Sequence, residues 1–411
     1  MTSPRRDLSI AAALLLWAAA VGAQQPDASA AATVHVGPLS LRPVLQISNV
    51  GVDTNIFNEV EGQDPKSDWT FSVGPASDFW LRTGKGRLSG RAAATYDWFA
   101  TYGGQRSLGT RNDARFQLEF TRVRPYVGGS YLSMRDRPGH EIDVRVRHSE
   151  DGVNGGVELT VSKRTTFGVG WERRRTRFDA DARIGASWLS GLLNRRETTV
   201  KAGARYKLTP LTTFTLEGEV GRERFEFSPD RDANSVRVVP GLEFDTFALI
   251  DGSAKVGYRR LKMLTPGMPD FTGAVASVDL GYTLLGVTRF SVGVTRDVEY
   301  SYWIDEPYYV LTGATLTVAQ SVGGPWALVA RAGLQHLAYQ HVADPAASTA
   351  NTVAGIGDRV DRVRLLGGGL SYRVGPDVRV GLDANYYARS SDYDYRDYRG
   401  LRAGTSVTYG F

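Results

Sequence analysis

The feature that most constrains the fold is a series of long runs in which apolar and polar side chains alternate. In residues 87–98, Leu88, Tyr96 and Trp98 fall at even positions, whereas Arg91 and Asp97 fall at odd ones. Successive side chains of a strand point to opposite faces, so such a run predicts a β-strand with one apolar and one polar face. Similar runs continue to the end of the chain, separated by turns that contain glycine or proline. The sequence therefore predicts an all-β fold of antiparallel strands.

About 18 strands are predicted, an even number within the range of membrane β-barrels. Short turns and longer polar loops alternate along the chain, so both ends of the region should lie on the side of the short turns. The approximate strand ranges are 41–53, 68–83, 87–102, 110–121, 126–135, 142–161, 165–178, 197–207, 211–225, 234–248, 252–264, 271–284, 287–300, 306–320, 326–340, 358–374, 378–390 and 401–411.

Strand length and charge distinguish a membrane barrel from a soluble β-protein. Soluble strands are most often ~5–6 residues long, whereas a tilted membrane strand needs ~9–11. A β-solenoid or propeller would repeat a motif, and we find none in the sequence. We therefore predict a transmembrane, antiparallel up-and-down β-barrel over residues 41–411, with lipid outside and water inside. The candidate lumen-lining residues are Arg91, Glu119, Arg145, Arg147, Glu158, Lys201, Arg205, Glu217, Glu219, Lys255, Asp279, Arg379, Asp383 and Arg402.

The first 23 residues have the parts of a cleavable secretory signal. Arg5 and Arg6 precede an apolar run of about 13 residues, which is too short for a spanning helix, and small residues follow it. Residues 24–40 are predicted to be a flexible periplasmic lead-in. The chain contains 0 cysteines, so its stability does not come from disulfides.

The last strand ends on an aromatic residue. Leu401 to Phe411 alternates strictly, with Tyr409 and Phe411 on its apolar face. This ending resembles the last strand of bacterial outer-membrane β-barrels, in which the assembly machinery recognises a terminal aromatic residue. The resemblance implies that Tyr409 and Phe411 form an assembly signal and that the barrel-assembly machinery is a partner.

The sequence gives no indication of catalysis. It lacks a nucleophile elbow and a phosphate-binding glycine loop, and its histidines are not spaced as metal ligands on a helix: they are His35, His140, His148, His336 and His341. We expect no enzymatic activity and no cofactor or metal. Basic and acidic residues are interleaved, which argues against nucleic-acid binding.

Outer-membrane lipid and lipopolysaccharide are expected partners. Glu172 is followed by Arg173, Arg174 and Arg175 at a predicted strand end. Such a basic rim fits either anionic sugar or lipopolysaccharide phosphate, or a solvated edge with no ligand.

One long connection, residues 179–196, carries an unusual number of apolar side chains. Trp188, Leu189, Leu192 and Leu193 are poorly suited to an exposed loop. They fit a segment that packs onto the inner wall and constricts the channel. A docking site for a partner and the apolar ends of two long hairpin strands are the alternatives.

The first predicted strand and loop carry a family resemblance. Residues 41–45 lead into residues 51–58, in which Asp53, Asn55 and Phe57 form an Asp-x-Asn-x-aromatic turn. This pattern resembles the putative β-barrel porin 2 type of outer-membrane protein. The resemblance implies exopolysaccharide secretion and periplasmic polysaccharide-export components as partners. From the residues themselves we expect a channel or conduit. A barrel with a closed lumen and a general diffusion porin are the alternatives, and an energised receptor would need a plug domain that residues 24–39 are too short to form.

Overall fold

The computed structural model of the chain describes residues 32–60, 62–246, 248–342 and 359–410. The predicted signal peptide, residues 24–31 of the predicted lead-in and Phe411 lie outside the described residues. Within them, no helix is long and apolar enough to cross a membrane.

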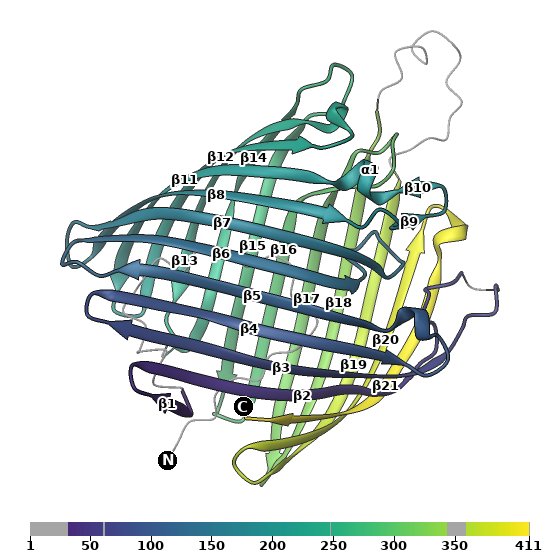
Figure 1. The fold of residues 1–411 in the computed structure, drawn as a ribbon, viewed down its shortest axis with the longest axis horizontal. Coiled ribbons are helices and arrows are strands. Elements are labelled where there is room, and N and C mark those ends of the chain that lie inside the picture. Colours follow the sequence, from purple (N-terminus) through teal and green to yellow (C-terminus); the bar gives the residue numbers. More distant parts are fainter. Residues whose placement is uncertain (1–31, 61, 247, 343–358, 411) are drawn as a thin grey trace.

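The described residues form one closed barrel of eighteen antiparallel strands (Figure 1). These strands are β2 (Leu39–Asp53), β3 (Asp68–Thr83), β4 (Gly86–Phe99), β5 (Ser107–Leu118), β6 (Val123–Asp136), β7 (Val146–Thr160), β8 (Thr165–Phe178), β11 (Arg195–Thr209), β12 (Thr212–Phe225), β13 (Ala233–Phe244), β14 (Ile250–Met263), β15 (Phe271–Leu284), β16 (Thr288–Tyr300), β17 (Tyr308–Gly323), β18 (Trp326–Gln340), β19 (Val360–Val374), β20 (Val378–Ser391) and β21 (Tyr398–Tyr409).

Each strand pairs with its neighbours in the chain, and the first and last strands close the ring. Leu45 of β2 lies opposite Tyr409 of β21, and Asp53 lies opposite Arg402. The short turns gather at the end of the barrel that holds the chain termini, which we call the short-turn end. The longer connections gather at the opposite, long-loop end. This arrangement confirms the predicted fold class.

Several short elements lie in the connections at the long-loop end. The connection from β8 to β11 contains the short strands β9 (Arg183–Ile184) and β10 (Ser187–Trp188), which pair with each other, and helix α1 (Leu189–Leu193). Single 3-10 turns are η2 (Gly103–Gln105), η3 (Pro229–Arg231) and η4 (Asp394–Arg396).

The amino-terminal part of the barrel differs from the prediction. Residues 34–36 form strand β1 (Val34–Val36), which pairs back onto Leu39–Leu41 of β2. The described part of the lead-in is therefore a hairpin rather than a flexible segment. The tight turn has a physical reason, because Gly37 adopts a φ of 55°, which other residues rarely do.

Side chains alternate between the lipid face and the lumen along the wall. Val169, Val220 and Val256 point outward and are 61%, 56% and 56% exposed. Leu88, Tyr96, Leu118, Leu280 and Val407 occupy outward positions in the same alternation. Without lipid around them these residues count as exposed, and in a membrane their surroundings are acyl chains. The apolar face therefore lies where the sequence pattern placed it.

Neighbouring residues of β18 provide a test of this alternation. Leu334 points outward near mid-strand and is 49% exposed, whereas Gln335 points into the lumen beside Gly313. Leu334→Arg is expected to destabilise the barrel by about 2–4 kcal/mol, because it places a charge at lipid depth. Gln335→Arg, the matched control, should cost far less. Urea unfolding in lipid vesicles measures both, and equal losses would contradict the assigned faces.

Candidate functional site in the lumen and its mouth

Three connections meet inside the mouth at the long-loop end. They are residues 137–145 between β6 and β7, residues 179–194 between β8 and β11, and residues 301–307 between β16 and β17. Apolar side chains of these connections and of the adjoining strand ends form one buried group, which we call the mouth cluster: Ile142, Val146, Phe178, Ala182, Leu189, Leu193 and Tyr302. Apolar burial of this kind holds the three connections together.

The predicted constriction segment divides in the structure. Leu189 and Leu193 are 0% and 3% exposed within the mouth cluster, and Leu192 packs against it. Trp188 is 51% exposed and lies with its ring under the guanidinium of Arg183, 5.7 Å away. Three of the four residues thus pack within or against the mouth cluster, and Trp188 does not.

Residues 137–145 reach far across the mouth. Glu141 accepts hydrogen bonds from the Ser301 hydroxyl at 2.7 Å and the Tyr302 amide at 3.1 Å. Arg137 donates to the Ile56 carbonyl oxygen in the loop between β2 and β3. Burial raises the pKa of the Glu141 carboxyl, although Arg396 and both hydrogen bonds favour its charged form.

A buried ion-pair cluster fastens residues 137–145 to β20. Arg389 is 0% exposed at its side chain and contacts Asp143 Oδ1 at 2.5 Å and Asp361 Oδ2 at 3.0 Å. It also donates to the carbonyl oxygens of His140 and Glu141, at 3.0 and 3.1 Å. Since β20 and β7 lie far apart around the wall, these bonds hold the loop across the opening.

Two further arginines complete this ion-pair cluster. Arg396 of η4 contacts Asp143 Oδ2 at 2.7 Å and donates to the Tyr302 hydroxyl at 2.8 Å. Arg359 contacts Asp361 Oδ2 at 2.6 Å and Glu306 Oε2 at 3.0 Å. Buried charges persist only when paired and hydrogen-bonded. The cluster therefore holds residues 137–145, residues 301–307 and η4 in one arrangement against the ends of β19 and β20.

The ends of β16 and β17 leave the wall and turn into the lumen. The pairing of β15 with β16 ends at Ala276 opposite Arg296, although β16 continues to Tyr300. Beyond that point, Val298 and Tyr308 are buried in one group with Leu261 and other inward residues of β13–β15. This hairpin end is therefore covered on both faces.

Polar contacts fix the turned-in hairpin. The Tyr300 hydroxyl donates to Glu223 on the inner face of β12, and Arg231 donates to the carbonyl oxygens of Ser301 and Trp303. Burial lowers the pKa of Arg231 to about 10. Residues 301–307 thus stay over the lumen beside residues 137–145.

Most of the predicted lumen-lining charges lie on inward positions and meet partners on adjacent or nearby parts of the wall. The contacts are Arg91 with Asp78, Glu119 with Arg87, Arg145 with Asp97, Glu158 with Arg115, Lys201 with Glu172 and Glu219, Arg205 with Glu243, Glu217 with Lys255, Asp383 with Arg331, and Arg402 with Asp53. Asp279 and Arg379 occupy inward positions of β15 and β20. The wall therefore presents paired charges to the lumen.

Arg147 corrects one of these predictions. It lies opposite Arg135 on β6, and the neighbouring His148 is the inward residue, buried at 2% exposure. Arg147 therefore points outward, where it contacts Asp179 at 3.9 Å. Arg145, which was predicted to face the lumen together with Arg147, lies just before β7. Its side chain points inward and contacts Asp97, because this part of the chain belongs to the mouth and not to a strand.

At the end of the chain, Tyr409 is on the lipid face and is 56% exposed. The assembly role predicted for Tyr409 and Phe411 stays a prediction.

The ion-pair cluster of the mouth was missed in the sequence. Its members are Asp143, Glu306, Arg359, Asp361, Arg389 and Arg396. Several occupy loops or strand ends where charged residues are common. An Asp or Arg at a loop gives no signal of burial, because burial depends on where loops from distant strands meet. Among the described residues, no three His, Asp or Glu side chains gather as a metal site.

A closed barrel with an apolar belt and charge-lined lumen defines a class, the porin-like channels of the bacterial outer membrane. The model of the putative β-barrel porin 2 family matches residues 28–411, and the chain belongs to this family. No curated protein matches it.

The chain is also similar to solved outer-membrane proteins. The OpdK protein of Pseudomonas aeruginosa is 11% identical, with 90% of this chain and 98% of that chain covered at a TM-score of 0.48. OccAB3 of Acinetobacter baumannii is 9% identical, with coverages of 92% and 100% and a TM-score of 0.49. A BenF-like porin from Pseudomonas fluorescens Pf-5 is 11% identical, with coverages of 91% and 98% and a TM-score of 0.47.

Proposed function

We propose that the protein is a passive diffusion channel for small polar solutes, with a mouth narrowed by its own connections. The observation that carries this proposal is the lumen wall, in which charges such as Lys201, Glu219 and Asp383 are paired yet remain 34%, 23% and 33% exposed at their side chains. Charges that keep partial access to water fit an aqueous interior. Barrels of ~16–18 strands are wide enough for such a channel unless loops fill them.

The two sides of the lumen differ in a way that supports diffusion of polar solutes. The inward positions of β8–β14 carry dense ion pairs, for example Lys201 with Glu172. The inward positions of β17–β20 are mostly small or uncharged near mid-strand, such as Thr315, Gly333 and Gly367. Small side chains leave room, and paired charges orient dipolar solutes without binding them tightly.

Exopolysaccharide export, which the family resemblance implied, gains no support from the family match or the mouth. A polymer conduit needs an opening for a continuous chain, whereas the mouth cluster and its ion pairs hold three connections together across the barrel. The same observation favours a second candidate, a barrel whose lumen is closed. The proposal includes no catalytic step, and the assembly machinery and polysaccharide-export components stay predicted partners.

Conductance separates these candidates. Purified protein in a planar bilayer is expected to show discrete steps, and vesicles containing it should swell in a monosaccharide faster than in a trisaccharide. Swelling in a long-chain dextran would instead support a polymer conduit. Folded protein, shown by its heat-modifiable migration, that gives neither steps nor swelling would contradict the diffusion channel and favour the closed barrel.

A further inference from the structure

The lipid-facing wall carries a basic patch at the long-loop end of β8–β14. Five basic side chains point outward there and are exposed, and we call them the outer basic patch: Arg173, Arg196, Arg222, Arg260 and Lys262. None of the five has an ion pair within the described part of the chain. Arg174, which the sequence grouped with Arg173, points into the lumen and contacts Glu172 at 3.0 Å. The patch is thus a product of strand alternation.

Strand register sets the spacing of these charges. Arg173 lies opposite Thr198, which lies opposite Arg222. Arg222 in turn lies opposite Asn234, which lies opposite Lys262. Adjacent strands are ~4.8 Å apart, so the backbones of Arg173, Arg222 and Lys262 follow one another at intervals of about 10 Å. Arg196 lies one row closer to the rim and Arg260 one row deeper.

Nearby outward arginines already have acidic partners. Arg175 contacts Glu226 at 3.3 Å, and Arg177 contacts Asp151 at 2.8 Å. On the long-loop half of β8–β14, the outer basic patch therefore carries the outward charge that these acidic partners do not offset. Several cations held close together at a membrane surface attract an anionic headgroup, and arginine binds phosphate with directed, charge-assisted hydrogen bonds.

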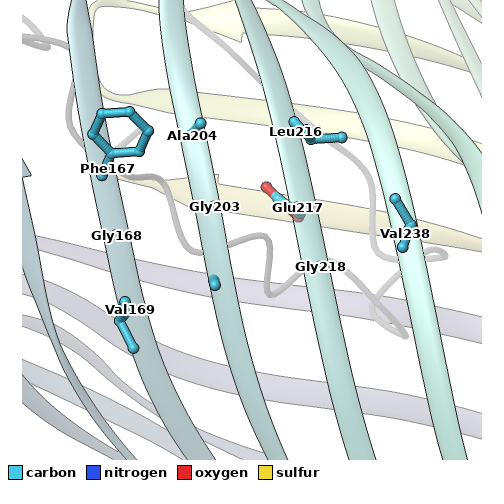
Figure 2. A pocket seen from close by; sticks show the side chains of 10 residues that line it. Phe167, Gly168, Val169, Gly203, Ala204, Leu216, Glu217, Gly218 and Val238 are labelled. Carbon is cyan, nitrogen blue, oxygen red and sulfur yellow. The ribbon is translucent and has the colours of Figure 1, made fainter.

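An apolar hollow of about 360 Å³ lies on four of the same strands, β8, β11, β12 and β13. The small Ala204 and Gly218 lie between the larger Phe167, Leu216 and Val238 (Figure 2). Ala202 also lines the hollow. Gly218 is four residues from Arg222 along β12, which corresponds to about 13 Å of strand. The hollow is thus at acyl-chain depth, and the outer basic patch is above it toward the rim.

We propose that this surface is a binding site for lipid A, the membrane anchor of lipopolysaccharide. In outer-membrane barrels the longer loops face outward, so the patch lies in the leaflet that lipopolysaccharide occupies. The phosphates of lipid A bind Arg173, Arg222 and Lys262, and one acyl chain fills the hollow. Charge complementarity and the order of the two features along the strands select this ligand. A phospholipid without net charge matches the hollow alone, and a free phosphate matches the patch alone.

Native mass spectrometry of the refolded full chain with bis-phosphorylated lipid A tests the proposal. The wild-type barrel is expected to retain one lipid A through detergent exchange. The double variant Arg173→Ala/Arg222→Ala should weaken its binding at least about tenfold, because it removes two of the cations that hydrogen-bond the phosphates. The matched control is Arg362→Ala/Arg364→Ala, which removes two exposed outward arginines of β19, a strand that does not line the hollow. It should leave binding unchanged.

Filling the hollow tests the second half of the site separately. Ala202→Leu adds an apolar side chain on the lipid face and leaves all five cations in place. It should also weaken lipid A binding severalfold, whereas Ala92→Leu on the outer face of β4 should not. Dephosphorylated lipid A and pyrophosphate should each bind the wild-type barrel more weakly than lipid A does.

Other outcomes would overturn the site. Equal affinity of the two arginine double variants would do so, as would phosphatidylethanolamine binding as tightly as lipid A. A lipid-free dimer that Ala202→Leu dissociates would assign the hollow to a second copy of the chain instead. Heat-modifiable migration confirms that each variant is folded, so a loss of binding cannot be mistaken for misassembly.

Discussion

Replacing residues 138–143 with a Gly/Ser linker of equal length is expected to raise the single-channel conductance severalfold. The replacement removes Glu141, Ile142 and Asp143, which join the mouth cluster and the ion pairs of Arg389. Without these side chains the connection loses its carboxylate contacts and the apolar contact of Ile142, and Arg137 and main-chain hydrogen bonds remain as its main ties across the opening. Planar-bilayer recordings of the variant and the wild-type protein under the same salt measure the change.

Two comparisons make this result specific. The same replacement over residues 187–193 removes Leu189 and Leu193 from the mouth cluster but leaves the Arg389 ion pairs intact, so it should raise conductance less. Replacing residues 265–267 with a linker of the same kind should leave the conductance unchanged, because Gly267 lies in open space at the surface. If the 138–143 variant conducts as the wild-type protein does, then residues 137–145 do not narrow the channel.

Arg389→Met is expected to free residues 137–145 without removing them. Breaking a buried ion pair costs about 3–5 kcal/mol. We expect the low end, about 3 kcal/mol, because Asp143 keeps Arg396 and Asp361 keeps Arg359. If opening of the loop governs exchange, its amides should exchange roughly a hundredfold faster, since each 1.4 kcal/mol is about tenfold.

Hydrogen exchange of residues 138–145 measures this effect, and Arg364→Met on the outer face of β19 is the control. The control keeps every mouth contact, so its exchange should match that of the wild-type protein. Unchanged exchange in Arg389→Met would show that the mouth cluster alone holds the loop in place.

Strand positions could be predicted well where alternation is strict and a short turn adjoins the strand. The structure gives 68–83 for β3 and 165–178 for β8, as the sequence predicted. The start of β7 was placed at 142, whereas it begins at Val146. Ile142 and Val144 alternate with polar neighbours as strand residues do, but they pack inward at the mouth. A short alternating run does not reveal whether its apolar side faces lipid or another loop.

The candidate site was predictable only in its wall. Inward charges such as Lys201 and Glu217 follow from alternation, because a polar face must meet water once the other face meets lipid. Arg147 and Glu158 were both predicted to face the lumen, although residues at odd and even positions of one strand lie on opposite faces. The ion pairs of Arg389 with Asp143 and Asp361 join residues 246 and 28 positions apart, and no local pattern indicates such a meeting.

The sequence by itself determined the all-β class, the even number of strands, the separation of a lipid face from a lumen face, and most of the charges on the wall. They follow because successive side chains of a strand point to opposite faces, and because an apolar face must meet lipid while a polar face must meet water. Only the tertiary structure decided which connections close over the mouth, which arginines are buried there, and that five outward cations lie above an apolar hollow. Those features depend on ring closure and register, which bring together side chains from strands that are distant in sequence.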